Sequence, residues 1–193
     1  VDYNAFYLSV FTGNFNCPNV KEIGVQSFYR SVFNGVFECQ NLQAVGNDAF
    51  YYSQFNGVFE CPNLQTVGYN AFYKSVFTGD FNCPNLQTVG NSAFVSSKFT
   101  GDFNCQNLQT IGFQAFFYSV FTGDFNCPNL QTIGIQAFYY SVFDTITIGA
   151  NATLGTSCIG AHSTEFIQDY ADNGKLAGTY VWDSNTQHWV YTP

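Results

Sequence analysis

Six cysteines recur at a fixed interval and are the most regular set of reactive side chains in the chain. Each follows the previous one by 22 residues; the column comprises Cys17, Cys39, Cys61, Cys83, Cys105 and Cys127. A zinc site needs ligands that converge on one point, whereas one cysteine per repeat forms a line. Stacked repeats would place equivalent Cα atoms about 4.8 Å apart, within disulfide range, but parallel side chains would hold the Cβ atoms beyond the usual separation of about 3.8 Å. We therefore expect buried free thiols, with disulfides between neighbouring repeats as the alternative.

Carboxylates form a second periodic set at the same interval. Asp80, Asp102 and Asp124 each follow the glycine of a T-G-D sequence. Stacked like charges repel one another, so these groups need either full solvation or a bridging cation, and calcium is an ion that carboxylate oxygens bind well. One carboxylate per repeat supplies few of the about six oxygens that calcium requires. We expect a solvated acidic face, with a calcium site as the alternative.

Tyrosines gather just after a recurring Ala-Phe or Ser-Phe pair. If that phenylalanine points inward, the residue after it should point outward, because neighbouring side chains in an extended chain alternate. The resulting set, called the aromatic stripe below, comprises Tyr7, Tyr29, Tyr51, Tyr52, Tyr73, Phe117, Tyr118, Tyr139 and Tyr140. An exposed aromatic surface of this length is typical of an interaction site. The alternative is that the rings pack flat against one another and stiffen the fold.

Residues for catalysis are sparse. The two histidines, His162 and His188, both lie near the C-terminal end and have no motif neighbours. Neither G-x-S-x-G, nor H-E-x-x-H, nor a phosphate-binding glycine loop occurs. Asp169 and Asp172 match a solvated helix face better than a glycosidase pair. The sequence predicts no enzymatic activity and, apart from the calcium alternative, no cofactor.

The repeat that positions these residues reads A-F-x-x-S-x-F-T-G-D-F-N-C-P-N-L-Q-T-V-G-x-x. Three phenylalanine columns contain 20 of the 23 phenylalanines. They are Phe6, Phe28, Phe50, Phe72, Phe94, Phe116 and Phe138; Phe11, Phe33, Phe55, Phe77, Phe99, Phe121 and Phe143; and Phe15, Phe37, Phe59, Phe81, Phe103 and Phe125. One repeat cannot bury such side chains alone, whereas stacked repeats share a continuous core, and each buried phenylalanine contributes about 1.5–3 kcal/mol. The pattern predicts a solenoid.

Glycines at eleven-residue steps divide each repeat in two. They predict two bends per coil, at T-G-D and at V-G-x-x, because glycine reaches positive φ without a steric clash. Between the bends, D-F-N-C and L-Q-T-V predict two short strands that belong to stacked parallel sheets. The Ala-Phe pair is expected in a turn or a short helical segment.

Composition excludes several classes of protein. Charged residues make up 9% of the chain, the net charge is −8, and hydrophobic residues reach 46%. This much apolar material excludes intrinsic disorder, and five scattered basic residues argue against a nucleic-acid partner. No apolar run approaches the about 18 residues of a membrane span.

The order C-x-x-L-x-x-V/I-G-x-x-A-F recurs through residues 1–143 and is matched by Cys83, Leu86, Val89, Gly90, Ala93 and Phe94. It resembles the BspA-like, or Treponema-type, leucine-rich repeats. The resemblance implies a leucine-rich-repeat-like solenoid in a secreted or cell-surface protein, mostly bacterial, that acts in adhesion or protein interaction.

Residues 144–193 depart from the repeat and predict a small α+β cap. Residues 144–149 and 153–160 are expected to form strands, and a helix with Ser163 or Thr164 as its N-cap is expected to end at Gly174. AGTYVW and QHWVY then predict a hairpin. This tail resembles the G-K-x-A-G-T-Y segment that closes many bacterial BspA-like chains. Such a cap would cover the open edge of the last coil.

Two functions remain. The first is a non-enzymatic extracellular or cell-surface protein whose broad solenoid face binds a protein partner or a host surface. The second is a structural subunit that assembles head to tail into a filament or surface layer, since the chain begins inside a repeat, with Val1–Ala5 aligned to residues 67–71.

Overall fold

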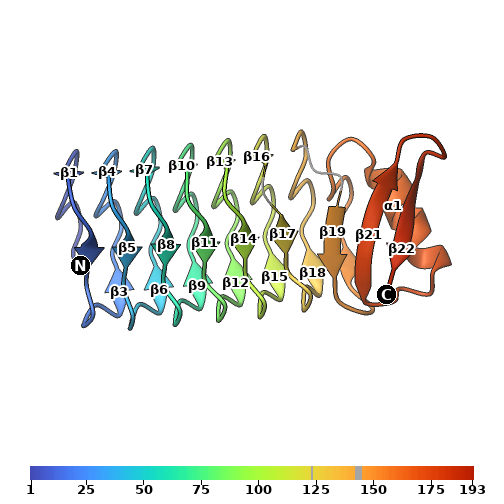
Figure 1. Cartoon of the computed structure of the whole chain (residues 1–193), viewed down its shortest axis with the longest axis horizontal. Helices are drawn as coiled ribbons and strands as arrows, with labels where there is room; N and C mark the ends of the chain where they lie inside the picture. Colours follow the sequence, from blue (N-terminus) through green and yellow to red (C-terminus); the bar gives the residue numbers. More distant parts are fainter. Residues whose placement is uncertain (123, 142–144) are drawn as a thin grey trace.

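The computed structural model of the chain describes residues 1–122, 124–141 and 145–193. Successive coils stack along one axis, with the N-terminus at one end and a compact cap that contains the only helix of the described residues at the other (Figure 1). The predicted solenoid is confirmed. Its strands are two residues long in the coils, so the fold depends on stacking between coils rather than on long strands.

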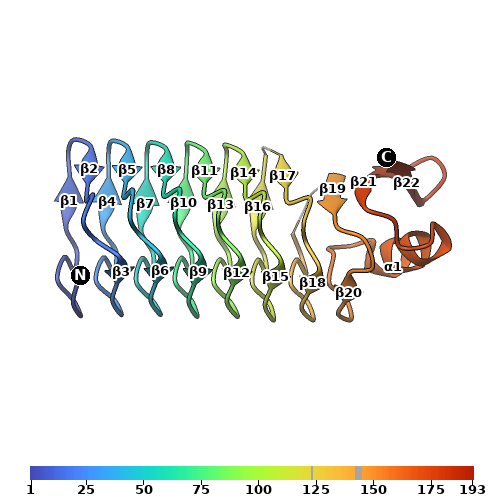
Figure 2. The ribbon, with the colours of Figure 1, turned by 90° about the horizontal axis from the view of Figure 1, so that it is seen from below.

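Three sheets run the length of the stack, and their strands lie on different sides of each coil (Figure 2). The first sheet contains β1 (Val10–Phe11), β4 (Val32–Phe33), β7 (Gln54–Phe55), β10 (Val76–Phe77), β13 (Lys98–Phe99) and β16 (Val120–Phe121). The second contains β2 (Phe15–Asn16), β5 (Phe37–Glu38), β8 (Phe59–Glu60), β11 (Phe81–Asn82), β14 (Phe103–Asn104) and β17 (Phe125–Asn126), and continues into the cap. The third contains β3 (Glu22–Ile23), β6 (Ala44–Val45), β9 (Thr66–Val67), β12 (Thr88–Val89), β15 (Thr110–Ile111), β18 (Thr132–Ile133) and β20 (Thr153–Leu154).

Each coil therefore has three strands and three corners, where the sequence predicts two of each. The missed strand follows the Ala-Phe turns directly, as in Val76–Phe77, and no glycine or proline separates it from them in the sequence. The missed corner is the C-P-N-L segment, where the amide of Leu86 donates to the carbonyl of Cys83 at 3.0 Å. Proline and asparagine are turn-forming residues, so this signal was present in the sequence. The Ala-Phe pair lies in turns and forms no helix.

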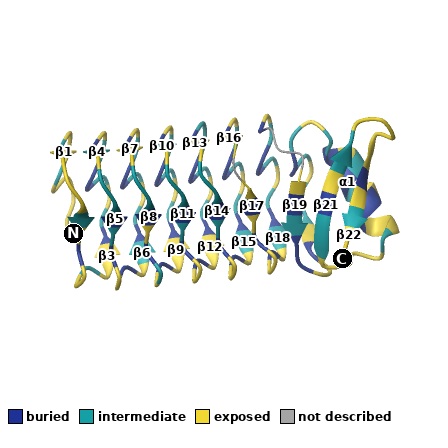
Figure 3. Ribbon diagram, viewed as in Figure 1, coloured by how far each residue is buried: buried dark blue, intermediate teal, exposed yellow. Residues whose placement is uncertain are grey.

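The phenylalanine columns fill the space between the sheets, and buried positions recur from coil to coil along the stack (Figure 3). Rings of one column stack in parallel: Phe72 lies 5.0 Å from Phe50 and 4.9 Å from Phe94, with interplanar angles of 4° and 2°. Rings of different columns meet edge to face, as between Phe77 and Phe81 at 89°. Both geometries are favourable for aromatic pairs. The vertical columns that the sequence predicts are confirmed.

The repeated glycines are required for a reason other than the predicted one. Of the described glycines only Gly174 and Gly178 have positive φ. A Cβ on Gly57 would instead lie 2.6 Å from the carbonyl oxygen of Gly35 in the preceding coil. Positive φ falls on side-chain-bearing residues of the Ala-Phe turns, such as Gln26 at 56° and Arg30 at 55°. The glycines permit close approach of coils, and the expectation of positive φ was wrong.

A buried serine ladder joins the coils beside the phenylalanines. Ser75 Oγ donates to the carbonyl oxygen of Phe50 at 2.8 Å, and Ser97 Oγ donates to that of Phe72 at 2.6 Å. Both serines are buried. The serine is part of the repeat, but its role was not predicted from the sequence. It supplies a hydrogen bond to a carbonyl that lies in the apolar core.

The cap continues the second sheet and then covers its end. β19 (Thr145–Ile148) pairs in parallel with β17 and antiparallel with β21 (Gly178–Asp183), which forms the predicted hairpin with β22 (His188–Thr192). α1 (Ser163–Asp172) ends before Gly174, whose φ is 70°, as predicted. Of residues 153–160, only Thr153–Leu154 form a strand. The predicted boundary, with Phe143 and Asp144, lies outside the described residues.

The predicted N-cap of α1 was wrong. The N-cap residue is His162, and its side chain makes no capping hydrogen bond. Ser163 Oγ instead accepts the amide N–H of Ile159, which precedes the helix, at 3.3 Å. The Ser163 side chain therefore stabilises the turn that leads into α1 and does not cap the helix.

Candidate functional site

The aromatic stripe begins as a column of parallel rings on the Ala-Phe turns. Tyr7, Tyr29 and Tyr51 stack at successive distances of 5.1 Å with interplanar angles of 5° and 3°. Tyr73 continues the column 4.7 Å from Tyr51. The phenylalanine before each of the last three tyrosines is buried, whereas the tyrosines are half-buried or exposed. The ladder packing considered from the sequence is thus present, and it leaves the ring edges and hydroxyl groups at the surface.

A second column runs beside the first and contains cations. Lys74 Nζ donates a hydrogen bond to Tyr52 Oη at 2.9 Å and lies 5.1 Å from the centre of that ring. The guanidinium of Arg30 lies 5.1 Å from the same centre and 5.7 Å from that of Tyr29. The hydrogen bond to Tyr52 raises the pKa of Lys74. Tyr52 is therefore flanked by two cations, one from each neighbouring coil.

The stripe resumes toward the cap. Tyr118 and Tyr140 stack at 4.5 Å, and Phe117 and Tyr139 lie 5.8 Å apart. Tyr118 is 52% exposed and Tyr140 is 55% exposed. One coil, which carries Val95 and Ser96 at the two stripe positions, separates this part from the first. The structure thus arranges the stripe as two aromatic patches.

Further exposed apolar residues lie four residues before the first column of the stripe and were not predicted from the sequence. They occupy one position of the repeat, which follows the glycine of V-G-x-x except in the first coil, where Asp2 stands in place of the glycine: Tyr3, Val25, Tyr69, Phe113 and Ile135. Tyr69 and Ile135 are each 51% exposed. Their interval of 22 residues, or a multiple of it, was visible in the sequence, but the residue types vary too much to form an obvious column.

The predicted acidic residues hold the backbone of the next coil. Asp80 Oδ1 accepts the amide N–H of Asp102 at 2.9 Å, and Asp102 Oδ1 accepts that of Asp124 at 3.0 Å. Asn14 has the same contact with Val36 at 3.0 Å. The position is therefore a side-chain ladder that satisfies backbone donors. Calcium binding stays a prediction; no cluster of three or more His, Cys, Asp or Glu side chains suited to a metal occurs in the part of the chain that the structure describes.

The cysteine column is buried as predicted, but its redox state differs at one end. Cys17 and Cys39 form a disulfide, with Cα atoms 4.8 Å apart. The expectation of free thiols is wrong for this pair, because it assumed fixed parallel Cβ vectors, whereas the Cα separation itself lies within disulfide range. Cys61, Cys83, Cys105 and Cys127 are free thiols with no exposed surface.

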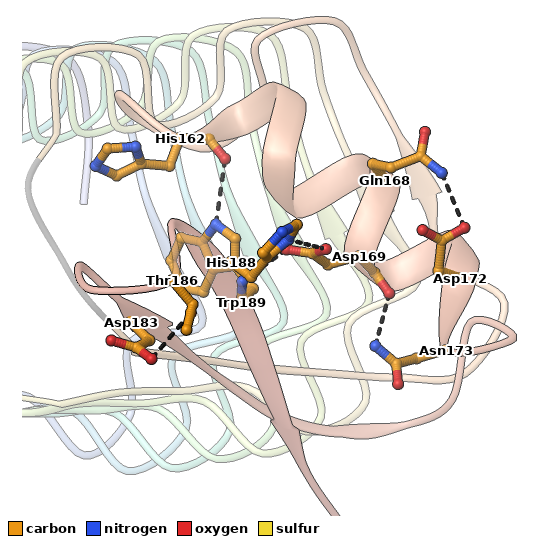
Figure 4. Close-up of polar contacts among 9 residues, drawn as sticks. All are labelled: His162, Gln168, Asp169, Asp172, Asn173, Asp183, Thr186, His188 and Trp189. Carbon is orange, nitrogen blue, oxygen red and sulfur yellow. Dashed lines mark hydrogen bonds and ion pairs between the residues drawn. The ribbon is translucent and has the colours of Figure 1, made fainter.

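The histidines are part of the cap, where they contact other residues of the cap (Figure 4). His188 Nδ1 lies 2.9 Å from Asp169 Oδ1, and Asp169 Oδ2 accepts the amide N–H of Trp189 at 2.6 Å. The His162 ring stacks on Trp182, with ring centres 3.7 Å apart. Within the described ranges, neither imidazole hydrogen-bonds to a serine, threonine or cysteine side chain. The arrangement joins α1 to β22 and has no nucleophile beside its histidines.

Fold and surface together define a class: a repeat solenoid with a C-terminal cap and an exposed aromatic surface, a kind of fold that is typically non-enzymatic. A family model described as "BspA type Leucine rich repeat region (6 copies)" matches residues 1–122 and 43–164. The chain belongs to this family of BspA-type leucine-rich repeats, as the sequence resemblance indicates. Neither a curated protein nor a solved structure matches the chain.

Among the described residues, no helix has the length and apolar character needed to cross a bilayer.

Proposed function

We propose that this chain is a non-enzymatic extracellular or cell-surface protein that binds a protein partner or a host surface through the aromatic stripe. The observation that carries the proposal is the stacked arrangement of half-buried and exposed tyrosines, with Arg30 and Lys74 held against their rings. Leucine-rich repeats generally mediate protein interactions, and BspA-type members are often associated with surfaces or adhesion. Both generalisations support the proposal.

The stacking favours binding because it orders the surface in advance. A tyrosine that already packs between two rings, such as Tyr29 or Tyr51, loses little conformational freedom when a partner contacts its edge and hydroxyl group. Tyrosine and arginine are also the residue types that contribute most at interface centres. The stripe, together with Arg30 and Lys74, therefore combines apolar area, hydrogen-bonding groups and positive charge on a rigid support.

The proposal is tested by adhesion of protein-coated beads to cultured epithelial cells. We expect the triple variant Tyr29→Ser, Tyr51→Ser, Tyr73→Ser to reduce bead retention about tenfold or more, because buried tyrosine anchors at interfaces commonly contribute about 2 kcal/mol each. The matched control is Gln65→Ser, Gln87→Ser, Gln109→Ser, an exposed column at the same interval outside the stripe.

Both variants are first compared with the parent chain by circular dichroism, so that only folded proteins enter the comparison. Equal retention of the two folded variants would exclude the stripe as the adhesive surface. Head-to-tail self-assembly stays a prediction; at the cap, β17 already pairs with β19 and β18 with β20, so the stacking edge at that end is occupied.

A further inference from the structure

The free thiols of the cysteine column repeat the placement of the bonded pair. Across the Cys17–Cys39 disulfide, the amide N–H of Cys17 donates to the carbonyl of the residue before Cys39 at 3.0 Å. The amides of Cys61 and Cys105 make the corresponding bonds to the next coil at 3.2 and 3.3 Å. The same backbone register therefore places these thiols beside the next cysteine of the column.

We propose that Cys61–Cys83 and Cys105–Cys127 are two further disulfide sites, and that the Cys17–Cys39 bond determines which neighbouring cysteines pair. Six cysteines in one file can pair between neighbours in only one way that uses every member, and this pairing begins with the first two. The alternative pairing, which begins with Cys39–Cys61, is excluded once Cys39 is bonded to Cys17. Coils would then be linked covalently in twos, with a non-covalent joint between successive pairs.

The oxidant is a small-molecule disulfide of the glutathione class. One cysteine thiolate attacks a sulfur of the oxidant and releases one thiolate, and the second cysteine thiolate then displaces the other, closing the protein S–S bond. The two cysteines lose two electrons and two protons, and the oxidant becomes two thiols. Because Cys83 and Cys105 have no exposed surface and burial raises their thiol pKa values, this exchange takes place before the coils close, during folding.

Cys158 is the internal reference. It lies off the column, and its thiol is 3.8 Å from Ser163 Oγ. Residues 144–193 contain no second cysteine with which Cys158 could pair, so Cys158 is expected to stay reduced.

The test is refolding of the denatured, reduced chain in a mixture of reduced and oxidised glutathione. The monomeric folded fraction is collected, and its intact mass and non-reduced peptic peptides are analysed. We expect three disulfides, each lowering the mass by about 2 Da, at Cys17–Cys39, Cys61–Cys83 and Cys105–Cys127. The control variant Cys158→Ser should keep all three, whereas Cys127→Ser should lose one and leave Cys105 free.

Several outcomes contradict the proposal. They are a folded fraction with only the Cys17–Cys39 bond, a folded fraction with no disulfide, and any peptide that links Cys39 to Cys61 or Cys83 to Cys105. Because the parent chain alone distinguishes these outcomes, the test does not depend on how well the variants fold.

Discussion

Replacement of one core phenylalanine should cost more stability in the middle of the stack than at its first coil. Phe72 is fully buried and stacks between Phe50 at 5.0 Å and Phe94 at 4.9 Å. Phe6 occupies the same repeat position in the first coil, is half-buried, and stacks on one ring only, that of Phe28 at 5.0 Å. The two residues therefore differ in their neighbours but not in their place in the repeat.

The magnitudes follow from burial and stacking. Large-to-small replacement of a buried phenylalanine costs about 3–5 kcal/mol, so we expect about 4 kcal/mol for Phe72→Ala. Each aromatic pair contributes about 0.5–1.5 kcal/mol beyond its buried area. Phe6→Ala loses one stacked pair instead of two and removes a side chain that is already partly exposed. We therefore expect about half the cost, about 2 kcal/mol.

Urea unfolding checks this difference with two separate signals. Far-ultraviolet circular dichroism reports mainly the coils, whereas fluorescence reports the cap, since both tryptophans, Trp182 and Trp189, lie there. Stability in a stacked array is carried by contacts between neighbouring units, so Phe72→Ala should lower the midpoint of both signals more than Phe6→Ala does. Equal losses for the two variants would refute the reasoning that inter-coil ring stacking carries the stability.

Two further predictions concern other buried columns. Ser97→Ala removes the hydrogen bond from Ser97 to the carbonyl oxygen of Phe72, which still accepts the amide N–H of Ser75 at 3.0 Å. We therefore expect urea unfolding to show a loss of about 1 kcal/mol in the free energy of unfolding, and no loss would show that the serine ladder is dispensable. Burial raises the thiol pKa values of Cys83 and Cys105 above the ordinary 9.0, so the folded state favours the protonated thiols. In the reduced protein, the free energy of unfolding should therefore be at its full value below pH 9 and fall above it. Cys83→Ala should reduce this fall, and an unchanged pH profile would contradict the prediction.

Sequence reasoning predicted the solenoid because the side chains that fill its core repeat with one constant period. Phe72, Phe77 and Phe81 differ in their place in the coil, yet each recurs every 22 residues, and periodicity of this kind has few explanations other than stacking. The third strand was missed because no glycine or proline separates it from the Ala-Phe turn before it. The glycines were assigned the wrong role because positive φ is a property of single residues, whereas the contact between Gly57 and Gly35 arises only after coils stack.

The aromatic residues of this surface were predictable from the sequence, but the cations that contact them were not. The regular interval placed Tyr29 and Tyr51 in one column, and the structure brings them together as expected. The cations were not predicted, because Arg30 and Lys74 occupy a column that elsewhere contains leucine, serine or tyrosine. Only the geometry shows that both approach the Tyr52 ring.

The coil with Val95 and Ser96 has a consequence for how a long ligand could align. An uninterrupted ladder offers identical contacts at every step, so a bound chain could shift by one coil without loss. A gap removes this degeneracy, since a ligand that spans both patches has its best overlap at one position. Val95→Tyr combined with Ser96→Tyr would remove the gap and leave Arg30 and Lys74 as the remaining features that fix the alignment.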